Sequence, residues 1–432
     1  MKSKEISSSI WLVGEKLFTL TVNLVIMLMI ARSLGPESYG TLNYLLAIIA
    51  LLAPITALGL NSLITKEVLN RVSEREKIIG TSLMIRLLGS IAGLAIITTL
   101  CFVTNIANGN NTSLILLAVA NIFAATGVID FYLQAKMLNQ AVVKMRVVVM
   151  LIANSMRLFG LYLNVGVEFY ILVACLELIL TGIGFLVLYH MNTKSLFKLA
   201  PKLSEGRYLL GKSSWLLLSG IAAIIYLKMD QVMLGLLSNQ TQVGIYSVAS
   251  RLSEVWYFIP TAIVVSFFPK LIKLKSSPRY LIELQKLNDV LFLLAVLVAI
   301  PTTLLAKPVI ILLFGEEYQA AGIVLSIHIW AGVFIFMRTL LSKWLINENL
   351  LKFSLITQIT GAMFNVLLNF WLIPLYGAIG AAVATVISYA SASYFALFFH
   401  KSTLPMAKVM SKSFLLPIRL VVDGKNTYQF KS

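Results

Sequence analysis

Long apolar segments alternate with short polar breaks along almost the whole chain. When it is cut at the charged and turn-rich breaks, about twelve segments of roughly 20 residues or more remain, the length that a helix needs to cross the hydrocarbon of a bilayer. Little of the chain is left for a soluble domain. The pattern predicts helices at about 6–30, 41–64, 79–103, 113–136, 143–164, 168–190, 213–237, 243–269, 288–313, 319–342, 351–373 and 377–399.

The composition supports a membrane-embedded chain. Of the 432 residues, 59% are hydrophobic and 12% are charged, and the mean hydropathy is +0.89. A soluble core could not hide so much apolar surface from water, whereas a bilayer can. We therefore expect an all-α integral membrane protein. Cys101 and Cys175 each lie in an apolar segment and there are three histidines, so neither a disulfide framework, a metal site nor a cofactor is expected.

The net charge of +17 could suggest nucleic-acid binding. The placement of the 35 Lys and Arg residues along the chain distinguishes this from a membrane topology signal. If the N-terminus is cytoplasmic, most of them fall at cytoplasmic helix ends, and only Arg32 and Lys307 fall at the opposite ends. The positive-inside rule produces such an asymmetry. The charge therefore indicates a topology with both termini cytoplasmic, and no nucleic-acid partner is expected.

One motif has to be rejected. The stretch "GRYLLGKS" (Gly206–Ser213) matches the phosphate-binding pattern G-x-x-x-x-G-K-[ST]. A phosphate-binding loop must follow a buried strand and open a helix in an α/β domain. Here a basic loop precedes the stretch and a membrane segment follows it, so nucleotide binding is not predicted. No G-x-S-x-G or H-E-x-x-H pattern appears, and no outward-facing loop is long enough for the active site of a membrane glycosyltransferase or polymerase.

An internal repeat divides the chain. A shift of 204 positions places "MLMIARSLGPESYGTLNYLLAI" over "QVMLGLLSNQTQVGIYSVASRL" and aligns Gly40 with Gly244. Two halves of six helices that both start inside imply a parallel repeat about an axis along the membrane normal, as in many transporters. The expected divisions are an N-terminal six-helix lobe, a cytoplasmic inter-lobe loop, a C-terminal six-helix lobe and a basic cytoplasmic tail, at 1–190, 191–212, 213–400 and 401–432.

Several short motifs resemble a known family. They are "RSLGPESYG" (32–40), "DQVMLG" (230–235) leading into "VGIYSVASRLSEVWYFIP" (243–260), "LFGEEYQAAG" (313–322) and "YGAIGAAVATVISY" (376–389). In this order they resemble the polysaccharide-exporting flippases of the multidrug/oligosaccharidyl-lipid/polysaccharide exporter superfamily, of the O-antigen flippase type, over about residues 6–400. The resemblance implies a V-shaped fold with a central cleft. It also implies that undecaprenyl-diphosphate-linked oligosaccharide moves by alternating access to the periplasmic leaflet of a bacterial inner membrane.

Charged residues inside the predicted spans can be placed by depth. Asp230 lies about ten residues before the turn near 240 and Arg251 about eleven after it, so both should lie at similar depth. Lys228 and Glu254 straddle the same turn. Arg157 and Glu177 straddle the turn near 166 in the same way. A second, inward layer is expected to contain Glu15, Lys16, Arg86, Asp130 and Arg338.

Two interpretations of these charges stay open. The pairs either lock neighbouring helices together or line a water-filled cleft that admits a diphosphate and a sugar while the polyprenyl tail stays in lipid. We favour the cleft, because the planar donor fork of arginine suits a diphosphate. The basic candidates for substrate binding are Lys16, Arg86, Arg157, Lys228, Arg251 and Arg338. The acidic candidates for the cleft or for ion coupling are Glu15, Asp130, Glu177, Asp230 and Glu254.

Three classes of function remain, and the lipid-linked oligosaccharide flippase leads. A cation-coupled drug antiporter of the same superfamily would be expected to have a lobe dominated by unpaired carboxylates. A membrane-embedded enzyme of polysaccharide assembly would need a large outward loop. The expected partners are the lipid-linked oligosaccharide and membrane lipid. Coupling to H⁺ or Na⁺, association with polysaccharide-assembly proteins, the identity of the sugar and the oligomeric state stay open.

Overall fold

The computed structural model describes residues 2–193 and 201–419, and within these ranges the regular structure is entirely helical. This confirms the all-α class predicted from the apolar pattern. By its internal contacts the chain forms two compact units, residues 1–244 (unit 1) and 245–432 (unit 2). The sequence analysis divides the chain at 190 and 213 rather than at 244, and these lobe boundaries stay predictions.

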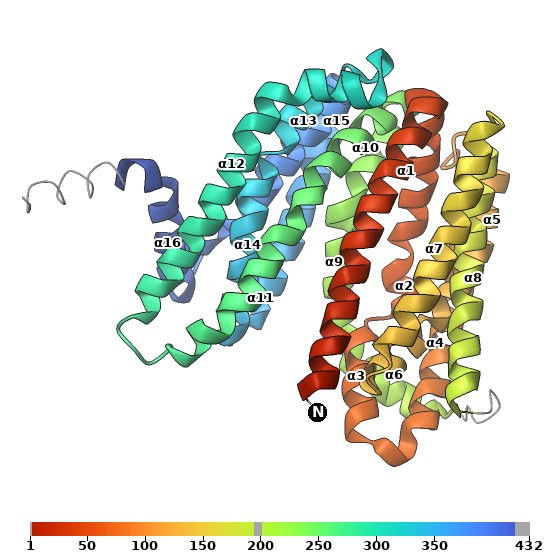
Figure 1. The fold of residues 1–432 in the computed structure, drawn as a ribbon, viewed down its shortest axis with the longest axis horizontal. Coiled ribbons are helices and arrows are strands. Elements are labelled where there is room, and N and C mark those ends of the chain that lie inside the picture. The colour runs from red at the N-terminus through yellow and green to blue at the C-terminus, as the bar shows by residue number, and fades with distance from the viewer. Residues whose placement is uncertain (1, 194–200, 420–432) are drawn as a thin grey trace, which may run out of the picture. The chain divides into compact units, whose positions relative to one another are not determined.

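Unit 1 is built around long helices that pack side by side. Helix α7 lies between α1 and α8, α9 packs on α1, and the 3₁₀ segment η2 packs between α4 and α8 (Figure 1). Its elements are α1 (Lys2–Leu51), α2 (Ala53–Ala57), α3 (Asn61–Asn70), η1 (Val72–Glu74), α4 (Arg75–Val103), α5 (Asn111–Ala120), η2 (Asn121–Gly127), α6 (Val128–Ala135), α7 (Asn139–Tyr162), α8 (Val167–Thr193) and α9 (Leu203–Leu237), followed by the start of α10 (Gln240–Glu254).

Unit 2 holds the rest of α10 and a second set of helices. Helix α12 packs against α13, α14 and α16, while α15 packs against α13 and α14. The elements after α10 are η3 (Val255–Tyr257), α11 (Phe258–Lys273), α12 (Tyr280–Phe314), η4 (Glu316–Tyr318), α13 (Ala321–His328), α14 (Ala331–Asn347), α15 (Leu351–Ser393), η5 (Phe395–Phe399), η6 (Lys401–Thr403) and α16 (Leu404–Phe414).

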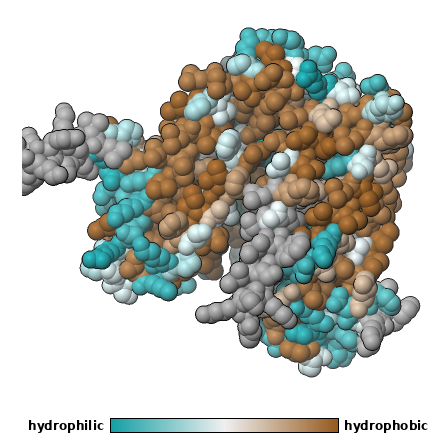
Figure 2. All heavy atoms as spheres, viewed as in Figure 1, coloured by the Kyte–Doolittle hydropathy of each residue, from teal (hydrophilic) through white to brown (hydrophobic). Residues whose placement is uncertain are grey.

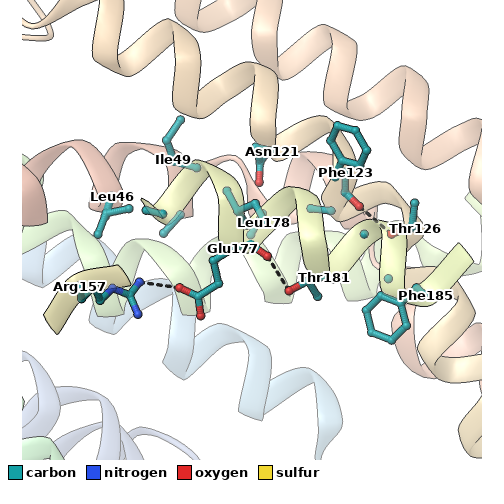
Figure 3. Close-up of a pocket in the computed structure, with 16 residues that line it drawn as sticks. Leu46, Ile49, Asn121, Phe123, Thr126, Arg157, Glu177, Leu178, Thr181 and Phe185 are labelled. Atoms are coloured by element: carbon teal, nitrogen blue, oxygen red, sulfur yellow. Dashed lines mark hydrogen bonds and ion pairs between the residues drawn. The ribbon is translucent and has the colours of Figure 1, made fainter. Parts of the chain in front are cut away.

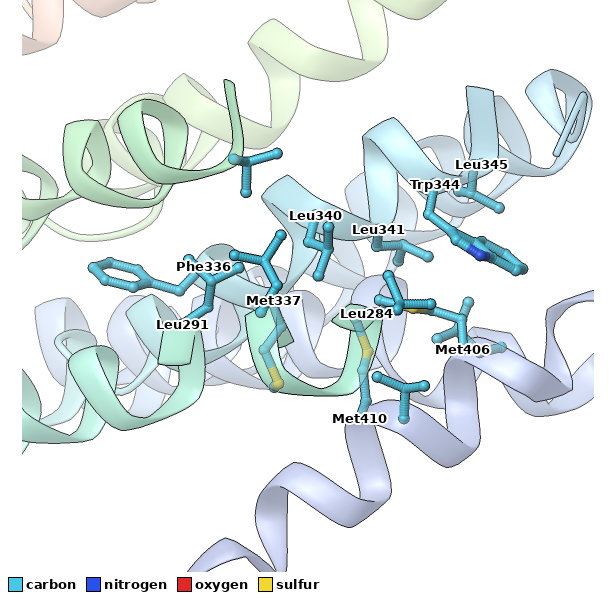
Figure 4. Close-up of a cluster of buried hydrophobic side chains, with 14 of the residues drawn as sticks. Leu284, Leu291, Phe336, Met337, Leu340, Leu341, Trp344, Leu345, Met406 and Met410 are labelled. Carbon is cyan, nitrogen blue, oxygen red and sulfur yellow. The ribbon is translucent and has the colours of Figure 1, made fainter. Parts of the chain in front are cut away.

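The segment after His400, expected to be a cytoplasmic tail, joins the core of unit 2 as far as α16. Met406 and Met410 of α16 are fully buried against Leu284 of α12 and Leu341 of α14 (Figure 4). The physical reason is an apolar face on α16, which is stable only when another element covers it. Residues 420–432 of the predicted tail lie outside the described residues.

Nine helical stretches of the described chain are long and apolar enough to cross a membrane. The two longest, 18–57 and 351–399, each contain a glycine with non-helical angles, Gly35 (φ 72°) and Gly377 (φ 53°). The sequence pattern predicts two segments at each of these places. The predicted count of twelve spans therefore stays a prediction. On both units the visible face is mainly hydrophobic, and hydrophilic side chains gather toward helix ends (Figure 2).

Two glycines permit an unusually close approach of backbones in unit 1. A Cβ atom added at Gly40 would lie 1.8 Å from the carbonyl oxygen of Gln240, and one added at Gly244 would lie 1.9 Å from that of Pro36. Each glycine thus lies against the carbonyl of the residue four positions before the other glycine. Small residues allow this kind of helix contact in membranes. These are the two glycines that the internal repeat aligns.

The rejected phosphate-loop motif is part of a continuous helix. Gly206–Ser213 lies inside α9, which begins at Leu203, ten residues before the predicted start at 213. The ammonium of Lys212 forms an ion pair with Glu67 at 3.2 Å. Nearby, Arg71 donates to both carboxylate oxygens of Glu205 at 2.5 and 2.8 Å. Its hydrogen bonding to Glu205 is the largest influence raising the pKa of the Arg71 guanidinium.

We predict that Gly40→Ala destabilises the protein by about 1–3 kcal/mol, because the added methyl group overpacks a contact between two backbones. Gly211→Ala is the matched control, since a Cβ at Gly211 would meet nothing within 4 Å. Alanine there should be neutral or slightly stabilising in the helix. The midpoints of thermal unfolding of the purified variants test this, and equal midpoints for the two would contradict the glycine contact.

Candidate functional site

A cavity of about 490 Å³ lies inside unit 1. Its walls come from the second half of α1, the start of α2, the 3₁₀ segment η2, one residue of α7 and the middle of α8. Figure 3 shows the Arg157–Glu177 pair at one end of the lining and the rings of Phe123 and Phe185 at the other. A mainly apolar cavity with a few convergent polar groups is the usual form of a small-molecule site.

A break in a predicted span forms one wall of this cavity. The sequence pattern predicts one helix over 113–136, but the structure has α5, the 3₁₀ segment η2 and α6 there. A 3₁₀ turn within a long helix often marks a functional region. Irregular backbone inside a membrane is tolerated where protein or a cavity surrounds it. Here Arg86 contributes to that support, because its Nη2 donates to the carbonyl oxygen of Ala124 at 3.2 Å.

The predicted pair of Arg157 and Glu177 is brought together at the cavity wall. Nη2 of Arg157 donates to Oε2 of Glu177 at 2.5 Å, and Nη1 donates to Oδ1 of Asn154 at 2.8 Å. Asn154 in turn donates to Oδ1 of Asn23 at 3.4 Å. This chain of contacts joins α1, α7 and α8. The expectation that Arg157 and Glu177 lie at similar depth is confirmed, while their role in binding stays a prediction.

Uncharged polar groups also line the cavity. Thr126 and Thr181 each donate a hydrogen bond to a carbonyl within their own segment, so their hydroxyl oxygens can still accept one from a ligand. Asn121 is only 8% exposed, and its amide makes no hydrogen bond with any residue that the structure describes. The amide atoms are accessible from the cavity, so water or a ligand there can complete their hydrogen bonds.

Arg86 and Asp130, both predicted for the inward layer, are buried near η2. Arg86 is 6% exposed, and within the described chain its Nε and Nη1 have no hydrogen-bond partner. Asp130 pairs instead with Arg146, whose Nη2 lies 2.6 Å from Oδ2. By the positive-inside rule, Arg146 is counted among the basic residues at a cytoplasmic helix end. Its role as a partner of Asp130 depends on the turn between α6 and α7, which the sequence pattern does not specify.

The other predicted residues are distributed over both units. Asp230 is 3% exposed in α9, and Lys228, two positions before it in the same helix, is half-buried. Arg251 is exposed and Glu254 half-buried in α10. Because these four fall into different units, their pairing across the turn near 240 stays a prediction.

Arg338 of α14 donates from Nη1 to the carbonyl oxygen of Ala392 at 2.9 Å, which ties α14 to the end of α15. Glu15 and Lys16 belong to α1, but their side chains lie outside the described residues.

Asn121 and the aromatic pair were missed by the sequence analysis. The sequence feature that could have indicated them is the run "NIFAATG" (121–127), where an asparagine, a threonine and a glycine interrupt an otherwise apolar span. Among the described residues, no group of three or more His, Cys, Asp or Glu side chains gathers as a metal site would require. Cys101 and Cys175 are free and buried.

The fold and the cavity define a polytopic α-helical membrane protein with a mainly apolar cavity that carries a few polar groups. A comparison with family models matches residues 6–275, well over half of the chain, to the family described as polysaccharide biosynthesis protein. The chain belongs to this family.

Two curated proteins of Haloferax volcanii match part of the chain. The probable flippase AglR is 31% identical over 169 residues, which are 37% of this chain and 35% of that protein. The probable low-salt glycan biosynthesis flippase Agl15 is 25% identical over 169 residues, which are 38% of this chain and 35% of that protein. The match thus spans about a third of the length of these relatives.

Solved structures share the fold along almost the whole chain. The lipid II flippase MurJ in an inward closed conformation has a TM-score of 0.71 at 14% identity, with 97% of this chain and 93% of that chain covered. An inward-facing multidrug resistance MATE family transporter of the MOP superfamily has a TM-score of 0.61 at 16% identity, with 91% and 96% covered. At these identities the likeness establishes the fold.

We predict that Arg157→Met destabilises the protein by about 1–3 kcal/mol, because it leaves the Glu177 carboxylate without its charged partner. The loss of unfolding free energy should be smaller than for a fully buried ion pair, since the Glu177 side chain is 34% exposed. The exchanged pair Arg157→Glu with Glu177→Arg should recover much of the loss. Thermal unfolding of the purified variants measures both effects.

Glu283→Gln is the control for this comparison. Glu283 forms ion pairs with Lys270 and Lys286, whose side chains are both 67% exposed, so the change should have little effect on the unfolding midpoint. If Arg157→Met were no more destabilising than Glu283→Gln, the pair would not stabilise the bundle.

Proposed function

We propose that the protein is a flippase that carries a lipid-linked oligosaccharide across the membrane, and that it is a transporter rather than an enzyme. The observation that carries the proposal is the cavity of unit 1. It gathers an arginine, a glutamate, an asparagine and two threonines inside helices that are mostly apolar enough to cross a bilayer. Polar groups at membrane depth are unfavourable, and they commonly mark a substrate pathway.

The comparisons support a glycan as cargo. The family is described by polysaccharide biosynthesis, and both curated relatives carry the word flippase in their descriptions. The fold is shared with MurJ, a protein described as a lipid II flippase. The finer form of the proposal follows the resemblance in the sequence. It is export of an undecaprenyl-diphosphate-linked O-antigen or related repeat unit through a bacterial inner membrane, with both termini cytoplasmic and transport by alternating access.

Arg251 is the proposed contact for the diphosphate of the carrier lipid. Both Nη atoms of Arg157 already donate to protein acceptors, and Arg86 and Arg338 each donate to a backbone carbonyl. Arg251, by contrast, is exposed on α10 and makes no ion pair or hydrogen bond with any described residue. A free guanidinium offers the planar, two-pronged donor geometry that a phosphate group prefers.

The two alternative functions fit less well. A cation or drug antiporter shares this fold, as the MATE neighbour indicates, but it would be expected to use unpaired carboxylates. In the spans of unit 1, Glu177 and Asp130 are instead each paired with an arginine. An assembly enzyme would need a large loop, whereas the described connections at 104–110, 163–166 and 238–239 are short. Coupling to H⁺ or Na⁺ and association with polysaccharide-assembly proteins remain part of the proposal.

We predict that deleting the protein abolishes surface glycan while lipid-linked repeat units accumulate on the inner leaflet. Complementation by Arg251→Ala should fail although the variant is present in the membrane at normal abundance. Lysine at this position should restore part of the activity, because it keeps the positive charge but lacks the planar, two-pronged donor geometry of the guanidinium. Surface-glycan staining and extraction of lipid-linked intermediates are the measurements.

Arg279→Ala, which removes an exposed arginine next to α12, should complement fully. Normal surface glycan in the deletion strain, together with altered drug sensitivity, would reject the flippase in favour of the antiporter. Full complementation by Arg251→Ala would remove Arg251 from the diphosphate site.

A further inference from the structure

The cavity of unit 1 has a lining with no net charge. Arg157 and Glu177 are the only ionisable residues among the described residues that line it, and they neutralise each other in a direct ion pair. An anion would have to compete with the Glu177 carboxylate, and a cation with the Arg157 guanidinium. Neither a diphosphate nor a cationic drug therefore suits this cavity, whereas a neutral polar ligand does.

The polar groups on the lining complement hydroxyl groups. The Glu177 side chain is 34% exposed, and its carboxylate retains acceptor sites beyond its bond with Arg157. Asn121 offers two N–H donors and a carbonyl acceptor, none of them used by a described residue. The hydroxyl oxygen of Thr181, whose proton is donated to the Glu177 carbonyl, can accept. A ligand that carries several hydroxyl groups, each of them both donor and acceptor, can satisfy this set.

Apolar surface provides the other half of the lining. Phe123 from η2 and Phe185 from α8 present aromatic rings at the end of the cavity away from the ion pair (Figure 3). Aromatic rings offer large, rigid apolar surface with an electron-rich face. The C–H faces of a sugar ring can pack on such surface while its hydroxyl groups reach Asn121 and Glu177.

We propose that this cavity is a saccharide-binding site that holds one uncharged sugar residue of the transported glycan. The inference rests on the proposed function and adds a division of labour to it. The sugar is recognised in unit 1 by Asn121, Glu177, Phe123 and Phe185, and the diphosphate is held by a separate cationic group. The Arg157–Glu177 ion pair is then a positioning device, since it fixes the carboxylate that accepts from the sugar.

Asn121→Leu is the sharpest test. Because Asn121 has no hydrogen-bond partner in the described chain, an apolar residue of similar size should keep or raise the thermal stability of the protein. The same change should remove contacts with the sugar. A merely structural asparagine would show the reverse, a loss of stability with no effect on ligand preference.

The experiment measures binding by the purified full chain in detergent with two probes. One is the lipid-linked repeat unit extracted from the deletion strain, and the other is the bare polyprenyl diphosphate. The unchanged protein should bind the glycosylated lipid more tightly. Asn121→Leu and Glu177→Gln should each weaken binding of that lipid about tenfold, which corresponds to one hydrogen bond to a buried polar group, and leave the bare lipid unaffected. Glu168→Gln, exposed on the same helix α8, is the matched control and should change neither affinity.

Each other outcome has a definite meaning. An equal loss for both lipids would overturn the saccharide site, because the residues would then act on the diphosphate or on the fold. An unchanged preference in both variants would also overturn it, because the sugar would bind elsewhere while the flippase proposal survived. If the unchanged protein bound neither lipid, the proposed function itself would fail, and the saccharide site with it. Thr181→Val gives an independent variant if Glu177→Gln does not fold.

Discussion

An ionised side chain at membrane depth must be neutralised by a partner, a backbone dipole or water, and the cavity region of unit 1 depends on this constraint. Arg157 meets it through Glu177 and Asn154, and Asp130 meets it through Arg146. Arg86 meets it in part through the carbonyl of Ala124 in η2. These contacts join α4, η2, α6, α7 and α8. The same side chains that would be unfavourable alone therefore hold the walls of the cavity in place.

Neutralisation also shapes what the cavity can bind. Because Arg157 is held by two acceptors, its charge is directed at the protein rather than at a ligand. The cavity is mainly apolar and has no net charge, and the amide of Asn121 on its lining has no hydrogen-bond partner among the described residues. Under the proposed function, this arrangement separates recognition of the sugar from recognition of the diphosphate. A flippase benefits from such a separation, since a cargo held by many weak contacts can be released more readily than one held by a strong charge pair.

The sequence alone predicts most helices and the depth of the buried charges, but it does not predict side-chain direction or helix breaks. Apolar length locates most helices, because each must cover the hydrocarbon. Counting residues from a turn predicts depth, which is why Arg157 and Glu177 were matched correctly. Depth, however, says nothing about which way a side chain points around its helix. Depth therefore assigns Asp130 to the inward layer without identifying Arg146 as its ion-pair partner.

The second failure concerns helix breaks. The 3₁₀ segment η2 contains no proline, and its backbone is supported by Arg86, which lies in another helix, so the polar run at 121–127 is only a weak local sign of the break. Likewise, the contact of Gly40 with Gln240 depends on two segments about 200 residues apart in the chain. The aligned glycines of the repeat point to both positions, but not to the fact that they meet.

The most direct test of the central claim is transport by the purified protein in sealed vesicles that contain the lipid-linked oligosaccharide. An enzyme that removes the sugar is added outside, so that only molecules in the outer leaflet are cut. If the protein is a flippase, it should make molecules from the inner leaflet accessible to the added enzyme, so that a larger fraction is cut than in protein-free vesicles. The flippase proposal would be contradicted if this fraction did not rise while the same vesicles exchanged a cationic drug for H⁺ or Na⁺.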